Sequence, residues 1–106
     1  MLSYFDLKEG VTIDEFSALN TQFAARMQAL GLIESIGPIG RRQRHPVMDT
    51  DRNRDQEYFF LMSFTDRDQC DQAVTCIQSH TEPEESIHHG ISSKIENYIF
   101  ICWADI

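Results

Sequence analysis

Two segments of this sequence are apolar on both of the faces that a β-strand would present. Successive side chains of a strand point to opposite sides of its sheet, so each face is read from every second residue. In residues 57–64 one face carries Tyr58, Phe60, Met62 and Phe64, and the other carries Phe59 and Leu61. In residues 95–104 one face carries Tyr98, Phe100, Cys102 and Ala104, and the other carries Ile99, Ile101 and Trp103. A sheet built on these strands must therefore be covered on both sides.

The rest of the chain predicts two amphipathic helices and two further strands. Thr12 and Glu15 match a capping box, and apolar residues then recur at three- and four-residue steps up to Gly31, which predicts a helix over 13–30. Thr65 or Asp66 is expected to cap a second helix, which fades near His80. The other expected segments are a strand over 1–7, a strand over 32–43 weakened by Gly37, Pro38 and Gly40, a solvated loop over 45–56 and a short helical turn within 81–90.

The order of these elements is strand, helix, strand, strand, helix, strand. That order predicts a single ferredoxin-like α+β domain over residues 1–106, with the connectivity βαββαβ and an antiparallel four-stranded sheet. Two helices can cover only one side of this sheet, and the other side would leave a larger apolar patch than a soluble monomer normally exposes. We therefore expect a second copy of the chain, related by twofold symmetry, to cover it.

With this element order and its two-faced strands, the sequence resembles the dimeric α/β-barrel superfamily, in which two ferredoxin-like chains pack sheet against sheet. The superfamily includes antibiotic-biosynthesis-type monooxygenases, heme-degrading enzymes, lactone isomerases, stress-responsive barrel proteins and members of unknown function. The resemblance covers nearly the whole chain and implies a pocket between sheet and helices for a small aromatic or cyclic molecule. The catalytic pattern of no single subfamily is matched residue by residue.

The net charge of −8, from 17 acidic and nine basic residues, argues against nucleic acid as a partner. An RNA-recognition motif has the same element order, but its third strand needs a basic residue and glycines where this chain has Glu57, Tyr58 and Phe60. The longest apolar run, residues 98–104, is far short of the roughly 20 residues that span a bilayer. No secretory signal precedes the first strand, and Cys70, Cys76 and Cys102 are expected to be reduced, which predicts a cytoplasmic protein.

The basic residues are concentrated in one stretch. Residues 41–54 contain five arginines and two aspartates, for a net charge of +3, while the other residues carry −11. The arginines are Arg41, Arg42, Arg44, Arg52 and Arg54. Guanidinium groups bind carboxylates and phosphates through paired hydrogen bonds, so this stretch is a candidate anion-binding arm. The alternative is a solvated loop that pairs with the acidic residues of its own chain or of a twin subunit.

Histidines and aromatic residues supply the remaining candidates. His88 and His89 are the candidate catalytic residues, because an imidazole transfers protons near neutral pH. A metal site at these histidines, His80 and Glu84 or Glu85 is not predicted, since adjacent side chains diverge and no ligand spacing is present. Tyr58, Tyr98 and Trp103 are candidate walls of a ligand pocket, although strand aromatics serve equally in cores and dimer interfaces.

We therefore predict a homodimer that binds a small anionic or aromatic molecule. It would act without a cofactor if it is an enzyme, and the monooxygenase or isomerase chemistry is implied by the resemblance alone. The alternative is a non-catalytic assembly or regulatory module that docks through residues 41–54. The sequence leaves open whether the chain is an enzyme.

Overall fold

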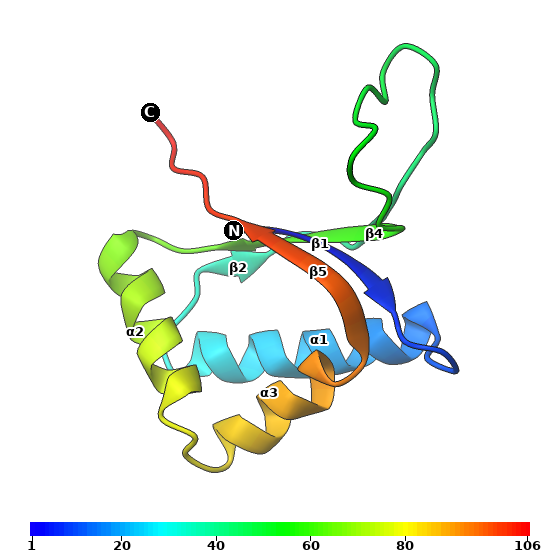
Figure 1. Ribbon diagram of the computed structural model, residues 1–106. Coiled ribbons are helices and arrows are strands. Elements are labelled where there is room, and N and C mark those ends of the chain that lie inside the picture. Colours follow the sequence, from blue (N-terminus) through cyan, green and yellow to red (C-terminus); the bar gives the residue numbers. More distant parts are fainter.

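The computed structural model describes residues 1–106. Its elements, in chain order, are β1 (Leu2–Leu7), α1 (Ile13–Ala29), β2 (Ser35–Ile36), β3 (Gly40–Arg41), β4 (Tyr58–Ser63), α2 (Arg67–Gln78), α3 (Glu84–Ser92) and β5 (Ile95–Ile101). The three helices lie together on one side of the sheet (Figure 1). None of them has the length and hydropathy that crossing a membrane would require.

The strands form one antiparallel sheet in the order β2-β4-β1-β5, and the short β3 also pairs with β4. β1 therefore lies between β4 and β5, and β5 forms one edge of the sheet. Together with the two main helices on one face, this is the ferredoxin-like α+β fold predicted from the sequence.

The core lies between α1 and the central strands. Phe5 of β1 is fully buried and its ring lies 4.8 Å from that of Phe16 on α1, measured between ring centroids. Phe60 of β4 completes this cluster, with its ring 5.7 Å from Phe5 and 6.3 Å from Phe16. The aromatic stripe of α1 thus packs directly on β1 and on β4, one of the two strands that the sequence predicts to be apolar on both faces.

Both predicted helix starts are confirmed at the level of hydrogen bonds. The hydroxyl of Thr12 accepts a hydrogen bond from the amide of Glu15 at 3.1 Å, and the carboxylate of Asp66 accepts one from the amide of Gln69 at 2.8 Å. The Glu15 carboxylate does not complete the capping box as expected, because it lies 3.4 Å from Lys94 Nζ instead. Gly31 ends the first helix with a φ of 72°, as its position predicts.

Three segment boundaries differ from the prediction. The strand expected over 32–43 is two short pieces, because Pro38 has no amide hydrogen to donate and pairing resumes only at Gly40. The turn expected within 81–90 is a nine-residue helix, α3, which buries Ile91 and Glu84. The last strand stops at Ile101, not at 104, because Ile101 pairs with Leu2, where β1 begins, and no partner remains beyond it.

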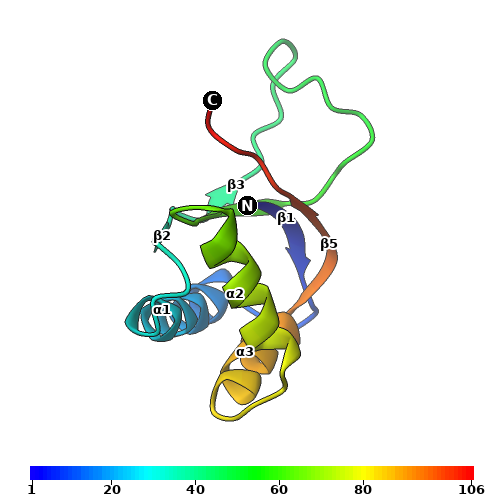
Figure 2. The same ribbon diagram turned by 90° about the vertical axis from the view of Figure 1, so that its left-hand side faces the viewer.

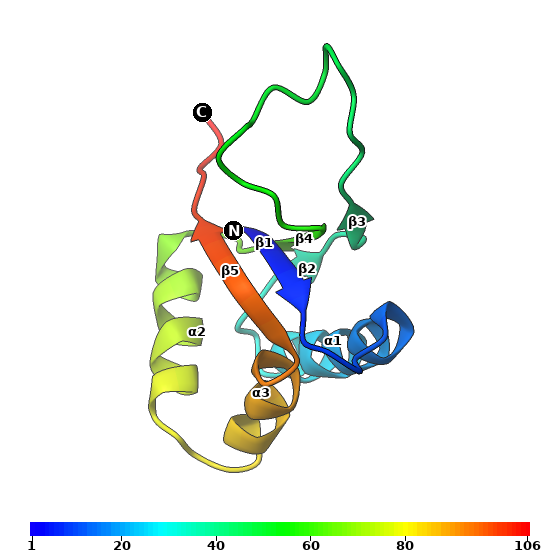
Figure 3. The same cartoon turned by 45° about the vertical axis from the view of Figure 1, so that its right-hand side comes forward.

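The face of the sheet away from the helices is here called the open face. Directly paired residues share a face, so the register places six apolar or aromatic side chains on it: Leu2, Tyr4, Phe59, Leu61, Ile99 and Ile101. No helix covers this face (Figures 1 and 3). The prediction that the helices cover one side only, leaving apolar residues of two strands on the other, is therefore confirmed.

Two segments project beyond the open face. One is the loop of residues 42–57 between β3 and β4, here called the arginine loop, and the other is the tail of residues 102–106. Both rise on the side of the sheet opposite the helices, and two views at right angles agree on this (Figures 1 and 2). The open face is thus flanked by the arginine loop at one end and by the C-terminal tail at the other (Figure 1).

Candidate functional site

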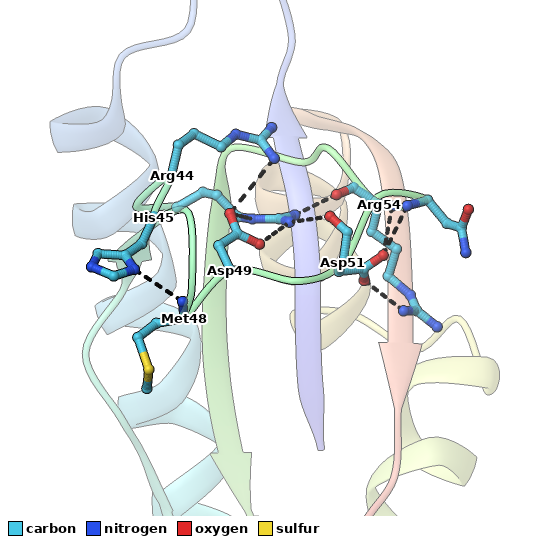
Figure 4. A network of polar contacts seen from close by, with 8 residues as sticks. Arg44, His45, Met48, Asp49, Asp51 and Arg54 are labelled. Carbon is cyan, nitrogen blue, oxygen red and sulfur yellow. Dashed lines mark hydrogen bonds and ion pairs between the residues drawn. The ribbon is translucent and has the colours of Figure 1, made fainter.

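The arginine loop is held in shape by an ion pair near its middle. Arg42 donates two hydrogen bonds to the Asp49 carboxylate, Nε to Oδ2 at 2.9 Å and Nη2 to Oδ1 at 2.6 Å (Figure 4). The same guanidinium donates to the backbone carbonyl oxygens of Asp51 and Arg54. This bonding lowers the pKa of Asp49 and raises that of Arg42, so the pair stays charged across the neutral range.

A second anchor is the tight turn at Asp51. Its carboxylate accepts hydrogen bonds from the amides of Asn53 at 2.9 Å and Arg54 at 3.2 Å, and from the Arg54 guanidinium at 2.6 Å. The guanidinium and these amides together lower the pKa of Asp51 to about 2. An aspartate that bonds the backbone two residues ahead forms an Asx turn, which fixes the returning half of the loop.

His45 organises the tip of the loop. Its Nδ1 accepts hydrogen bonds from the amides of Val47 at 3.1 Å and Met48 at 2.9 Å (Figure 4). These bonds hold the chain in a turn that leaves the Val47 side chain 70% exposed and the Met48 side chain 80% exposed. His45 therefore has a structural role in the loop.

The base of the loop is fastened across the sheet. Asp6 on β1 accepts hydrogen bonds from the Glu57 amide at 2.8 Å and from the Asn97 side chain at 3.2 Å. Gln56 donates to the Asn97 carbonyl oxygen on β5 at 2.7 Å. Asn97 lies at a register shift in β5 and has a φ of 51°, so the irregularity of this strand coincides with the place where the loop is attached.

The remaining arginines of the stretch have different surroundings. Arg41 lies on β3, donates to the Tyr58 hydroxyl at 3.0 Å and is 3.5 Å from the Glu57 carboxylate. Arg44 is 3.8 Å from Asp49 and largely exposed. The Arg52 side chain makes no hydrogen bond or ion pair in the structure. Arg42, Arg44 and Arg54 are thus gathered by two aspartates, while Arg41 belongs to the sheet and Arg52 faces solvent.

The candidate catalytic histidines lie on α3. His88 is partly buried with its ring 5.7 Å from Phe23 of α1, and burial, with a smaller contribution from His89, lowers its pKa below 6.5. The His89 side chain is exposed. His80 is also exposed, and its Nδ1 lies 3.2 Å from Glu85 Oε1. No group of three or more potential metal ligands is assembled anywhere in the chain.

The candidate aromatic residues do not form one wall. Tyr58 is buried, with its ring stacked 5.7 Å from Phe5. Tyr98 is 55% exposed and stacks on Phe100 at 5.2 Å, both on the helix side of the edge strand β5. Trp103 is 76% exposed in the tail beyond β5.

One chain does not bring the histidines and the arginines together. The arginine loop lies on the open-face side of the sheet and α3 lies on the helix side (Figure 1). An open hollow of about 340 Å³ within the loop is lined by polar groups and Pro46, and a larger one lies along the exposed side of α2. Neither hollow is lined by His88, His89 or Tyr58.

Asp49 and Asp51 hold the loop together, a role that the sequence did not predict, since it indicated only their charges. The signal for Asp51 is present, because Asp-Arg-Asn-Arg at 51–54 is typical of an Asx turn. The pairing of Asp49 with Arg42 has no comparable signal, since seven residues of loop separate them and no regular element fixes their distance. The partly buried ion pair of Arg26 with Glu84, with Nε and Nη2 2.8 and 2.5 Å from Oε1, was likewise not predicted.

Neither a protein-family model nor a curated protein matches the sequence. Among solved structures, the chain is similar to the protein At3g17210 from Arabidopsis thaliana, with a TM-score of 0.73 and 8% identity over 99% of this chain and 92% of that one. A dimeric protein of unknown function and ferredoxin-like fold from Bacteroides fragilis aligns over 92% of this chain and 86% of its own, with a TM-score of 0.43 and 16% identity. At 8% identity the first similarity shows the fold and no more, and the strand order with the helices on one face makes the chain a ferredoxin-like α+β protein.

Proposed function

We propose that the chain functions as a homodimer, in which two copies pack open face against open face to form a two-sheet barrel. The observation that carries the proposal is the open face itself, where Phe59 and Leu61 of β4 and Ile99 and Ile101 of β5 lie on either side of β1 with no helix above them. A contiguous apolar surface of this kind marks an interaction site in a soluble protein. In this role the protein is an assembly module, and its working unit is the dimer.

A second copy suits this surface better than an unrelated protein. Twofold packing places the same residues on both sides of the interface, so an apolar floor meets an apolar floor. The charge distribution favours the same partner, because residues 41–54 carry +3 and the rest of the chain −11. Each loop would then approach a body of opposite charge, which favours association and its correct orientation.

The test is the mass in solution, measured by light scattering and by sedimentation at micromolar concentration. Wild-type protein is expected to have twice the mass of one chain. Leu61 is 42% exposed on the open face, and Leu61→Glu would bury a charge in the interface and give monomers. Val74 is 47% exposed on α2, on the helix side, so Val74→Glu is the matched control and should remain dimeric. A monomeric wild type, or equal behaviour of the two variants, would contradict the proposal.

Binding of a small aromatic or anionic molecule on the helix side of the sheet is a second candidate function. It is supported by the half-exposed Tyr98 and Phe100 pair and by His88, whose lowered pKa keeps the imidazole neutral and able to accept a proton at pH 7. A thermal-shift screen with small aromatic carboxylates is expected to raise the unfolding temperature of the wild type and to have less effect on Tyr98→Ala. No shift with any compound in the wild type would exclude this function for the compounds screened.

A further inference from the structure

The arginine loop has an unusual division of labour among its side chains. The charged residues of its two anchors bond to one another and to the loop backbone, whereas Val47 and Met48, two of the most exposed large apolar residues of the chain, lie in the turn at its tip. An apolar side chain at a loop tip would ordinarily pack against the rest of the protein. Val47 and Met48 do not, because they stay 70% and 80% exposed. Val47 and Met48 lie in the turn at residues 46–48, and the loop that carries them rises away from its own sheet (Figure 1).

The loop is also preorganised. The bidentate pair of Arg42 with Asp49, the turn at Asp51 and the hydrogen bonds from the tip amides to His45 fix its outer part from within (Figure 4), while its base is tied to β1 and β5. A segment that is ordered before it binds loses less conformational entropy on association, so its contacts contribute more to affinity. This arrangement favours docking of the tip over a role as a flexible connection.

Charge indicates the occupant. Arg44 is only weakly held by Asp49, and Arg52 has no partner within the chain, so both remain available for acidic groups elsewhere. The acidic groups in excess belong to the same kind of chain, whose residues outside 41–54 carry −11. The loop rises past the open face that the proposed dimer would cover, so a second copy lies within its reach.

We infer that the arginine loop is an arm that grips the second copy of the chain in the dimer, with Met48 and Val47 as apolar anchors and Arg44 and Arg52 pairing with acidic residues of that copy. The inference rests on the proposed homodimer and adds to it a contact made outside the two sheets. Because the dimer is symmetric, the arm of each copy contacts the other copy, and this contact occurs twice in each dimer.

The test compares two variants of the same loop that introduce the same charge. Met48→Asp is expected to weaken the dimer about tenfold or more, measured as the dissociation constant by sedimentation equilibrium. Thr50→Asp, also at an exposed loop position, is the control, and its dissociation constant should stay within a few-fold of the wild type. Both positions are exposed, so both variants should fold, which circular dichroism checks.

The outcomes separate the two proposals. If Leu61→Glu is monomeric while Met48→Asp dimerises as tightly as the wild type, the arm inference is wrong and the sheet-to-sheet dimer stands. If Met48→Asp and Thr50→Asp weaken the dimer equally, charge in the loop matters and the apolar anchor does not, which also overturns the inference. If the wild type is monomeric, the proposed dimer fails first, and the loop has no second copy to grip.

Discussion

Gly40 shows how one residue is fixed by its cross-strand neighbour. It pairs with Phe59 of β4, and a Cβ built on Gly40 would overlap the Phe59 ring. The aromatic ring therefore lies over the glycine and occupies the space that a side chain would need. Gly40→Ala should force Phe59 out of this position and lower the free energy of unfolding by about 1–3 kcal/mol, measured by urea denaturation at constant protein concentration.

The same substitution at Gly90 is the control for that prediction. Gly90 lies inside α3, and a Cβ there would meet no atom within 4 Å. Gly90→Ala should raise the free energy of unfolding by roughly 0.5–1 kcal/mol, because alanine favours the helix. Changes of the same sign at both positions would contradict the close packing of Phe59 on Gly40.

The ion pair of Arg26 with Glu84 gives stability that depends on pH. The hydrogen bonds from Arg26 lower the pKa of Glu84 below its ordinary value of 4.5, so the unfolded chain binds this proton more readily than the folded one. The stabilisation is therefore complete above about pH 4.5 and is lost as the pH falls through the lowered pKa. The difference in unfolding free energy between wild type and Glu84→Gln should shrink between pH 7 and pH 3.

Glu34 provides the comparison for this pH dependence. Its side chain is exposed and makes no ion pair, so Glu34→Gln should differ little from wild type at any pH. Denaturant titrations at several pH values give the free energy of unfolding of the wild type, Glu84→Gln and Glu34→Gln. A difference for Glu84→Gln that does not change with pH would mean that Arg26 does not stabilise the carboxylate.

The helices differ in how firmly they are attached to the sheet. Five residues of α1 are buried, including Phe16, Phe23 and Met27, whereas Ala73 is the one buried residue of α2. The hydrogen bond that the Asp66 cap accepts from the Gln69 amide therefore matters more to α2 than the corresponding bond accepted by Thr12 does to α1. Segments with little buried apolar area open locally at a low free energy.

Hydrogen exchange tests this difference between the helices. Amides of α2 should exchange through local opening and faster than those in the middle of α1. Asp66→Ala should speed exchange in the first turns of α2 by an amount equivalent to about 1 kcal/mol and leave α1 unchanged. Gln72→Ala, more than one turn beyond the cap position at an exposed site, is the control. Equal protection of the two helices would show that α2 is held by more than its one buried residue.

Elements with a strong local pattern were predicted well from the sequence. The stripe of α1, its Thr12 cap and the two-faced strands depend on residues a few positions apart, and the structure confirms them. The end of β5 could not be read locally, because it is set by where β1 begins on the neighbouring strand. The length of α3 likewise depends on packing against α1 through Glu84 and Arg26, far apart in the sequence.

The candidate site was predictable only as a charge pattern. The concentration of arginines in 41–54 is evident in the sequence, but which of them are neutralised depends on the three-dimensional course of a loop without regular structure. Asp49 forms an ion pair with Arg42, and Asp51 forms one with Arg54. Arg44 and Arg52 are therefore the charges available to a partner. The separation of this loop from His88 follows from the layering of sheet and helices and has no counterpart in local sequence.

At the scale of the whole molecule, the buried core and the surface proposed for association fall on different sides of one sheet. The helix side is closed by α1 and α3, and the other side presents the open face, the arginine loop and the tail (Figures 1 and 3). Trp103, the only tryptophan of the chain, lies in that tail and is 76% exposed. The chain therefore carries its own fluorescent reporter on the side where a second copy would bind.

Dilution should change the emission of Trp103 if two copies pack on this side. In the dimer the indole would be partly removed from water and emit at shorter wavelength, and dilution through the dissociation constant should shift the emission to longer wavelength together with the fall in mass. Leu61→Glu should show the long-wavelength spectrum at every concentration. Dimerisation would bury the charge of the new carboxylate, so this variant should stay monomeric. If light scattering shows a dimer whose emission is already that of a fully exposed indole, the tail stays in solvent and the second copy is held by the sheet and the arginine loop without it.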